Sequence, residues 1–521
     1  MGRRGQSRRR LSLLERAGVR PRRRLRHALR PAATLGDSLL GLAFITLAAV
    51  VLESRGIAQA LMGRADATMV QRLLGTLAIL GALTALGLAY LARFQWRLVG
   101  TRRQMLVFGV CCLACIAAAR GLLALDARIE PSWRSLVYLT PLSAFTIFFA
   151  VVYGQREAIA AGIILAMLVG LVVHTAAPKG PAGPLPVVAV LLSGALLAAL
   201  ASRSIRKRMK LLNVGLLVGL LQAALMLGFH LLRGTLSLRE SPPFEVLWGL
   251  ANGLGSGMLL TILLPLIELV FDVATDIRLL ELTDQDQPLL RSLVTLAPST
   301  DNHSRRVARL AEAAADAVGA NSLLALVGSY YHDIGKMTKP EYYIENQMGG
   351  ENPHDRLKPS MSALLIASHV KDGVELATEA GLPHAIVEII EQHHGTSAIE
   401  FFYDRYLKQA GDNPVLDASF FRYSSPKPAT KEAAIVMIAD AVEAASRTLD
   451  QPIPSRIEAL VRRITDSKLL DGQLEDCRLT LSEVRLIEQA LFRVLCAMYH
   501  ARIEYPAPAP TASPRRASPH P

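Results

Sequence analysis

Long uncharged apolar runs between residue 35 and about residue 270 constrain this chain more than any other feature. Several approach the roughly 20 residues that an α-helix needs to cross a bilayer. These runs therefore argue against a fully soluble globular protein. We expect eight membrane spans, at residues 36–53, 70–92, 104–125, 134–154, 157–175, 185–202, 211–232 and 245–268.

Positive charge alternates between the loops that join these spans. Arg and Lys follow spans two, four and six, at residues 93–103, Arg156 and residues 203–210, and an Arg-rich segment precedes span one. Cytoplasmic loops carry the excess of Lys and Arg in membrane proteins. We therefore predict a multi-pass protein of the cell's inner (plasma) membrane. An even number of spans returns the C-terminal half to the cytoplasm.

The net charge of +13 resides mostly in the N-terminal tail. Twelve Arg and one Glu give residues 1–30 a charge of +11, so the rest of the chain carries only +2. This distribution predicts no basic groove, and we expect no nucleic acid polymer as a partner. Two roles of the tail stay open: it lies on anionic lipid head groups, or it only enforces the topology.

The membrane half is predicted to be an anchor or a sensor. A transporter usually places ionisable residues deep in the bilayer, whereas Arg120, His174, His230 and Glu268 fall near span ends. The first span has a cleaved signal peptide as its alternative, because Ala58-Gln59-Ala60 fits a cleavage site. Its apolar run is longer than a usual signal core, which favours a retained anchor.

The C-terminal half is predicted to be almost entirely helical. Gly319, Gly335 and Gly395 follow the ends of helical patterns, and Pro359 and Pro383 stand at starts. No apolar alternation of period two persists, so we expect no sheet. The predicted fold is all-α. It comprises a basic cytoplasmic tail (1–34), a polytopic α-helical membrane domain (35–270), a coupling segment (271–297), an all-helical cytoplasmic domain (298–505) and a disordered Pro-rich tail (506–521).

Imidazoles and carboxylates gather in the helical half. Five histidines are expected at helix ends, namely His303, His332, His369, His393 and His394. Asp333 follows His332, and Asp440 interrupts an apolar helical run. The helix macrodipole accounts for any one of these histidines, but a buried carboxylate needs a partner or a metal. Neutral imidazoles with carboxylates suit first-row transition ions. The set is large enough for two ions bridged by a carboxylate, and we leave His354 and His384 out of it.

The order of these residues resembles the His…His-Asp…Asp signature of HD-domain phosphohydrolases. More narrowly, residues 330–337 (Tyr-Tyr-His-Asp-Ile-Gly-Lys-Met) resemble the seven-transmembrane HD family, which includes the PgpH-like cyclic di-AMP phosphodiesterases. The resemblance covers about residues 250–505 closely and the membrane region in general form. Further matching stretches are residues 343–347, 352–355, 368–373, 391–396, 421–423, 426–441 and 471–474.

The resemblance implies an HD domain that binds two divalent metal ions, iron or manganese. One ion would be held by His303, His332, Asp333 and Asp440. The other would be held by Asp333, His369, His393 and His394. Asp333 would then bridge the two ions. The sequence does not choose between the two metals.

The implied activity is that of a membrane-anchored, metal-dependent cyclic-dinucleotide phosphodiesterase (a phosphoric diester hydrolase). Its expected reaction converts cyclic di-AMP to linear pApA. Asp333 and Lys336 are the expected catalytic residues, and Lys336 would also contact a phosphate oxygen of the substrate. Arg422 and Tyr423 would bind a phosphate or stack on a base. The expected partners are the cyclic dinucleotide and membrane lipid, and a homo-oligomer stays open.

Two departures from the family are visible in the sequence, and the second, beside the first ligand, leaves substrate preference and rate open. Family members usually carry a large extracellular domain after the first span, where this chain has only residues 54–69. The usual Gly-Thr-Tyr-His-His-Ser before the first ligand is replaced by Ser-Thr-Asp-Asn-His-Ser at residues 299–304. Asp301 therefore brings a carboxylate near the expected metal site.

Other functions remain as alternatives. An HD-GYP cyclic di-GMP phosphodiesterase shares the His-Asp-x-Gly-Lys motif, but it also requires Gly-Tyr-Pro, which this chain lacks. A phosphohydrolase of another nucleotide and a non-enzymatic nucleotide-binding membrane sensor stay open. The amount of bound metal per chain separates a sensor that has lost its metals from an enzyme.

Overall fold

The apolar runs and the helical patterns fold as two separate compact units in the computed structural model, one of residues 1–203 and 209–262 and one of residues 204–208 and 263–521. The structure describes residues 35–52, 67–94, 101–128, 135–176, 183–202, 205–234, 245–347, 351–410 and 416–500. The two predicted tails and the Ala58–Ala60 segment lie outside them. The regular elements of the described residues are all helices, with one isolated β-bridge between Ala398 and Arg422, so the all-α prediction is confirmed.

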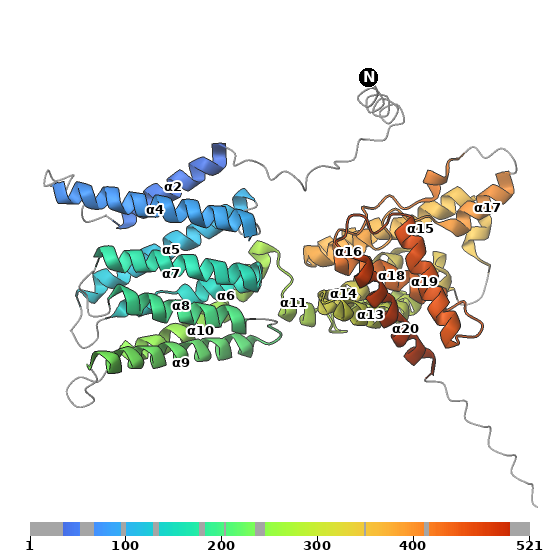
Figure 1. Cartoon of the computed structure of the whole chain (residues 1–521). Coiled ribbons are helices and arrows are strands. Elements are labelled where there is room, and N and C mark those ends of the chain that lie inside the picture. Colours follow the sequence, from blue (N-terminus) through green and yellow to red (C-terminus); the bar gives the residue numbers. More distant parts are fainter. Residues whose placement is uncertain are drawn as a thin grey trace, which may run out of the picture. The chain divides into compact units, whose positions relative to one another are not determined.

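The first unit contains the apolar helices (Figure 1). Among the described residues, six helices are long and apolar enough to cross a membrane, as expected of a multi-pass membrane protein. An 18-residue apolar helix, α2, precedes them. The helices of this unit are α2 (Leu35–Leu52), α4 (Ala67–Phe94), α5 (Arg102–Asp126), α6 (Leu142–Val152), α7 (Gln155–Ala176), α8 (Pro184–Ala201), α9 (Arg208–Arg233) and most of α10 (Glu245–Phe271), whose residues from 263 on fall in the second unit.

The span expected at residues 134–154 is not one continuous helix. A short 3₁₀ helix, η3 (Leu136–Leu139), is followed by Pro141 and then by the 11 residues of α6. Asn252 of α10 donates to the backbone oxygens of Tyr138, at 2.5 Å, and Thr140, at 3.2 Å. These bonds satisfy carbonyls that the break would otherwise leave without partners in an apolar interior. That the chain crosses the membrane eight times stays a prediction.

The second unit is built around one buried helix, α18 (Lys431–Ser446). Its residues 433–440 are all buried, and it packs against α13, α14, α16 and α19. The unit comprises α11 (Asp276–Glu281), α12 (Pro288–Leu296), α13 (Pro298–Ala317), α14 (Ser322–Tyr331), η4 (Ile334–Thr338), η5 (Pro340–Tyr342), η6 (Ile344–Asn346), η7 (Pro353–Arg356), α15 (Pro359–Glu379), α16 (His384–Gln392), α17 (Glu400–Ala410), η8 (Ala418–Phe421), α18, α19 (Pro454–Leu470) and α20 (Leu481–His500).

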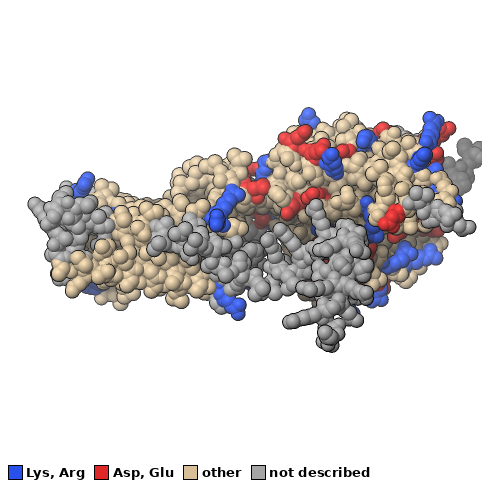
Figure 2. Space-filling view, turned by 90° about the horizontal axis from the view of Figure 1, so that it is seen from above, with Lys and Arg blue, Asp and Glu red and all other residues tan. Residues whose placement is uncertain are grey.

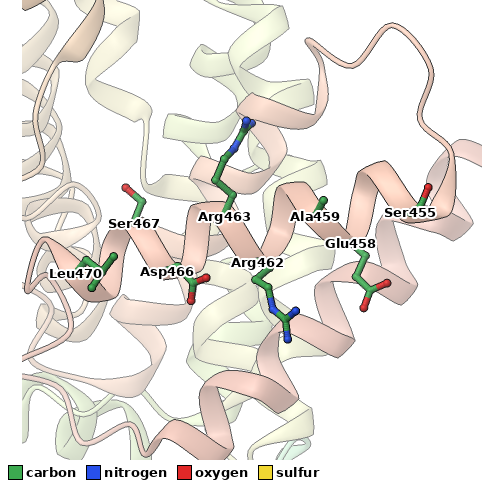
Figure 3. Close-up of a pocket in the computed structure, with 8 residues that line it drawn as sticks. All are labelled: Ser455, Glu458, Ala459, Arg462, Arg463, Asp466, Ser467 and Leu470. Carbon is green, nitrogen blue, oxygen red and sulfur yellow. The ribbon is translucent and has the colours of Figure 1, made fainter.

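The surfaces of the two units differ in charge. On the face shown in Figure 2, charged side chains are scarce over the described residues of the first unit and frequent over the second. A hollow lies along α19 of the second unit (Figure 3). It is lined by Ser455, Glu458, Ala459, Arg462, Arg463, Asp466, Ser467 and Leu470. These residues include none of the predicted site residues, so the hollow is not the expected active site.

Candidate metal centre

Five helical elements deliver the predicted site residues to one place. His332 and His393 are the C-cap residues of α14 and α16. His303 and His369 lie inside α13 and α15, so the expectation that each imidazole stands at a helix end is wrong for these two. Helix α15 continues ten residues beyond His369, to Glu379. Asp440 comes from the buried face of α18.

The two oxygens of Asp333 face two different groups of imidazoles. Its Oδ2 lies 3.2 Å from Nε2 of His332 and 3.7 Å from Nε2 of His303. Its Oδ1 lies 3.3 Å from Nε2 of His369 and 3.7 Å from Nε2 of His393. One carboxylate thus stands between two sets of nitrogen donors, which is the arrangement of a bridging ligand.

Asp440 also reaches both groups. Its Oδ1 lies 3.0 Å from Nε2 of His303 and 3.8 Å from Nε2 of His332. Its Oδ2 lies 3.8 Å from Nδ1 of His394, the remaining imidazole of the second group. The structure therefore brings together all seven residues that the sequence singled out as metal ligands.

Backbone carbonyls fix the orientation of three of the imidazoles. The Nδ1 atoms of His332, His369 and His393 each lie 2.7 Å from the carbonyl oxygen three residues earlier in the chain. A carbonyl only accepts, so each Nδ1 donates its hydrogen, and the Nε2 atom of each ring faces Asp333. Metal-binding histidines commonly have their second nitrogen engaged in this way.

Burial lowers the pKa of all five imidazoles, and in the group of His303 and His332 nearby carboxylates outweigh it. Burial lowers the pKa of His393 to about 3, and it also lowers the pKa values of His369 and His394, so these imidazoles are neutral. Burial opposes charge on His303 as well, but hydrogen bonds to Asp440 and Glu443 outweigh it and raise its pKa to about 9. Burial opposes charge on His332 too, but Asp333 raises its pKa to about 10.

The donor set fits divalent transition ions. Nε2 of His332 and Oδ1 of Asp333 are buried and have no hydrogen-bond partner, although buried polar atoms nearly always have one. Five imidazoles and two carboxylates are nitrogen and oxygen donors of the kind that first-row transition ions take. The buried His/Asp clusters are consistent with divalent metal binding.

Lys336 lies beside the carboxylate that the two groups share. Its Nζ is 2.8 Å from Oδ2 of Asp333 and 2.9 Å from Oε1 of Glu345. Burial opposes its charge, but these two carboxylates outweigh burial and raise the pKa of Lys336 well above its ordinary value. The ammonium is therefore held as a fixed positive charge at the edge of the site.

Arg422 and Tyr423 are engaged with the protein itself. The guanidinium of Arg422 donates to the carbonyl of Thr396 at 2.7 Å and pairs with both oxygens of Asp471, at 2.5 and 2.6 Å. The ring of Tyr423 stacks on His394 with 4.2 Å between centroids. Tyr423 thus supports a candidate ligand, and its predicted contact with substrate stays a prediction, as does that of Arg422.

Two carboxylates of the site were missed from the sequence. Glu345 holds Lys336, and Glu443 contacts His303. Glu443 follows Asp440 by three residues, which places both acids on one face of a helix. A second acid at that spacing in an apolar helical run was a usable signal. Glu345 lies in a short 3₁₀ element and gave no periodic signal.

The comparisons with known proteins agree with the geometry. A model of the "7TM receptor with intracellular HD hydrolase" family matches residues 70–275, and an HD domain model matches residues 300–445. The cyclic-di-AMP phosphodiesterase PgpH of Bacillus subtilis is 38% identical over 432 residues, which are 83% of this chain and 60% of that protein. PgpH of Listeria monocytogenes is 37% identical over 372 residues, which are 71% of this chain and 51% of that protein.

Solved structures of a relative's HD domain cover less than half of this chain. The crystal structure of the L. monocytogenes PgpH HD domain in complex with cyclic-di-AMP is 46% identical, covers 42% of this chain and all of that domain, and gives a TM-score of 0.39. The chain spans between about half and 60% of the length of the two full-length PgpH relatives. Two family models thus match consecutive parts of one chain, and the chain belongs to the family of seven-transmembrane proteins with an intracellular HD hydrolase domain.

Proposed function

We propose that this protein is a membrane-anchored, metal-dependent phosphodiesterase that hydrolyses cyclic di-AMP to linear pApA. The observation that carries the proposal is the position of Asp333, whose two oxygens face two separate groups of imidazoles. The two PgpH relatives, named for cyclic-di-AMP hydrolysis, support the choice of substrate. The proposed place of action is the cytoplasmic side of the inner membrane.

The proposed ligands divide as the sequence comparison implies. His303, His332 and Asp440 would hold one ion, His369, His393 and His394 would hold the other, and Asp333 would bridge them. Iron and manganese both suit this donor set. Two bound divalent ions supply an attacking water of lowered pKa and neutralise charge on the reacting phosphoryl group.

The chain's own residues then position the substrate. The ammonium of Lys336 stands 2.8 Å from Asp333, and it is placed to donate to a non-bridging phosphate oxygen beside the bridge. Burial of the imidazoles excludes bulk water from the donor atoms, since His332 and His393 are fully buried. The reaction breaks one phosphorus–oxygen bond to a 3′ oxygen and leaves a 5′-phosphate on the linear product.

Activity of the full chain in detergent micelles tests the proposal. With Mn²⁺ present, we expect cyclic di-AMP to be converted to pApA faster than cyclic di-GMP to its linear product. Asp333→Ala should abolish cleavage and reduce the bound metal, because it removes the bridge. Asp316→Ala, at an exposed aspartate of α13, is the matched control and should retain both.

Two outcomes would contradict the proposal. If cleavage survives in Asp333→Ala, the assignment of Asp333 as the bridging metal ligand is wrong. If the wild-type chain binds two ions but cleaves another nucleotide faster, the proposed metal centre stands and the proposed substrate is wrong.

A further inference from the structure

Glu443 is a buried acid in contact with a candidate metal ligand. It lies on α18, one turn after Asp440, and it is 2% exposed. Its Oε2 lies 2.5 Å from Nδ1 of His303. Its Oε1 lies 3.6 Å from Nη1 of Arg306, whose side chain is largely exposed. The carboxylate therefore has both a hydrogen-bond partner and a counter-charge, although it is buried.

His303 differs from three other imidazoles of the site in the group that its Nδ1 atom contacts. His332, His369 and His393 donate to carbonyls of their own helices, which no side-chain substitution removes. His303 faces a carboxylate contributed by a helix 140 residues away in the chain. A carboxylate accepts a stronger hydrogen bond than a neutral carbonyl does. It also makes the imidazole that it holds a better electron donor.

We propose that Glu443 is a positioning residue, which accepts the Nδ1 hydrogen of His303 and so directs Nε2 toward Asp333 and Asp440 to strengthen one of the two metal sites. This inference rests on the proposed function, because it requires the two-ion centre. Glu443 does not reach the substrate in this role, and it acts only through His303.

The effect is confined to one ion. His369, His393 and His394 form the second group around Oδ1 of Asp333. Two of these imidazoles are oriented by backbone carbonyls and the third stacks on Tyr423. None of these contacts involves Glu443. Loss of Glu443 should therefore weaken the group that contains His303 and leave the other group in place.

Metal binding by the full chain in detergent micelles tests the inference. The metal-free protein is titrated with Mn²⁺, free Mn²⁺ is followed by electron paramagnetic resonance, and bound metal is counted per chain. We expect Glu443→Ala to lower the affinity for one of two ions by about 10–100-fold and to leave the other unchanged. Glu443→Gln should lose less, because an amide oxygen still accepts a hydrogen bond but carries no charge.

The control and the contradicting outcomes are distinct. Glu432→Gln removes a carboxylate from the same helix, where Glu432 accepts from the backbone N–H of Asn321, and it should bind two ions as the wild type does. A wild-type chain that binds fewer than two ions defeats the proposed centre itself. A wild-type chain that binds two ions, with Glu443→Ala equal to it at both, defeats the role of Glu443. If Glu443→Ala fails to fold, Glu443→Gln equal to the wild type at both ions defeats the strengthening of the site by a charged acceptor.

Discussion

Asp333 and Lys336 form a buried ion pair, with 2.8 Å between Oδ2 and Nζ. The two residues are three positions apart in the sequence. Their pairing places a fixed positive charge beside the carboxylate that both groups of imidazoles share. Glu345, in η6, also contacts this ammonium, with 2.9 Å between its Oε1 and Nζ of Lys336. Lys336 is thus positioned by two carboxylates before any substrate binds, so little order has to be gained on binding.

Lys336→Met should lower kcat with little change in metal content. The substitution keeps an unbranched side chain as far as Cε and removes the ammonium that we place on a phosphate oxygen. Loss of one preorganised donor typically costs about 10²–10³-fold in kcat. Cyclic di-AMP turnover and bound Mn²⁺ are measured together. Lys371→Met, at a position whose side chain is 81% exposed, serves as the control. A tenfold change in KM with kcat intact would contradict a transition-state role.

Tyr423→Ala should weaken the second metal group, whereas Tyr423→Phe should not. The ring stacks on His394, and an aromatic pair of this kind contributes about 0.5–1.5 kcal/mol. The alanine variant should therefore lose up to about tenfold in affinity for one ion. Mn²⁺ titration measures it. If the alanine variant keeps its metal and only KM rises, the ring contacts the nucleotide instead.

Arg422→Ala should destabilise the second unit by about 1 kcal/mol and no more, because the side chains of Arg422 and Asp471 are 33% and 35% exposed and solvent partly screens the pair. Arg422 ties the carbonyl of Thr396, two residues after His394, to the segment that holds Asp471. Thermal unfolding of the full chain at neutral pH measures the loss. Arg422→Lys should recover part of it, since a lysine keeps the charge but not the paired donors.

The same pair should make this contribution depend on pH. Burial opposes charge on Asp471, but hydrogen bonds from Arg422 and Gln473 hold its pKa below the ordinary value of 3.8. A carboxyl group with a lowered pKa stabilises the fold above its unfolded pKa and loses that contribution as the pH falls through the folded pKa. The stability difference between wild type and Arg422→Ala should therefore shrink below about pH 4. A difference that stays constant there would exclude Asp471 as the partner that matters.

The sequence predicts the seven candidate ligands from their expected places at helix ends and from the family resemblance. The structure brings all seven together, although His303 and His369 lie inside their helices rather than at the ends. Helix α17 leaves only a weak pattern in the sequence, since Phe402 is its one buried apolar residue. Helix α15 was expected to end near His369, and packing against η4 extends it to Glu379.

Tertiary contacts explain what the sequence could not predict. Asn252 supports the break at Pro141 from more than 100 residues away, and Glu443 reaches His303 across 140 residues. Neither contact leaves a local pattern. The paired spacing of Asp440 and Glu443 shows only that a helix face carries two acids, and the partner of each acid depends on which helix packs there.

Gly335→Ala should disrupt the site more than any other glycine substitution near it. Gly335 follows the His332-Asp333 pair, and η4 passes so close to α15 that an added Cβ would lie 1.9 Å from the carbonyl oxygen of His369 and 2.5 Å from the amide nitrogen of Gly373. Both are backbone atoms and cannot rotate away. Relief of the clash must move α15, and with it His369, away from Asp333. We expect a loss of about 1–3 kcal/mol or more in stability.

Gly373→Ala is the matched comparison across the same contact. Its added Cβ would first meet a side-chain methyl of Ile390 at 3.0 Å, which can shift by a few tenths of an ångström. We therefore expect a smaller drop in the unfolding temperature and two bound Mn²⁺ ions in Gly373→Ala, against loss of the second ion in Gly335→Ala. Equal metal content in the two variants would mean that the close approach of η4 to α15 does not set the position of His369.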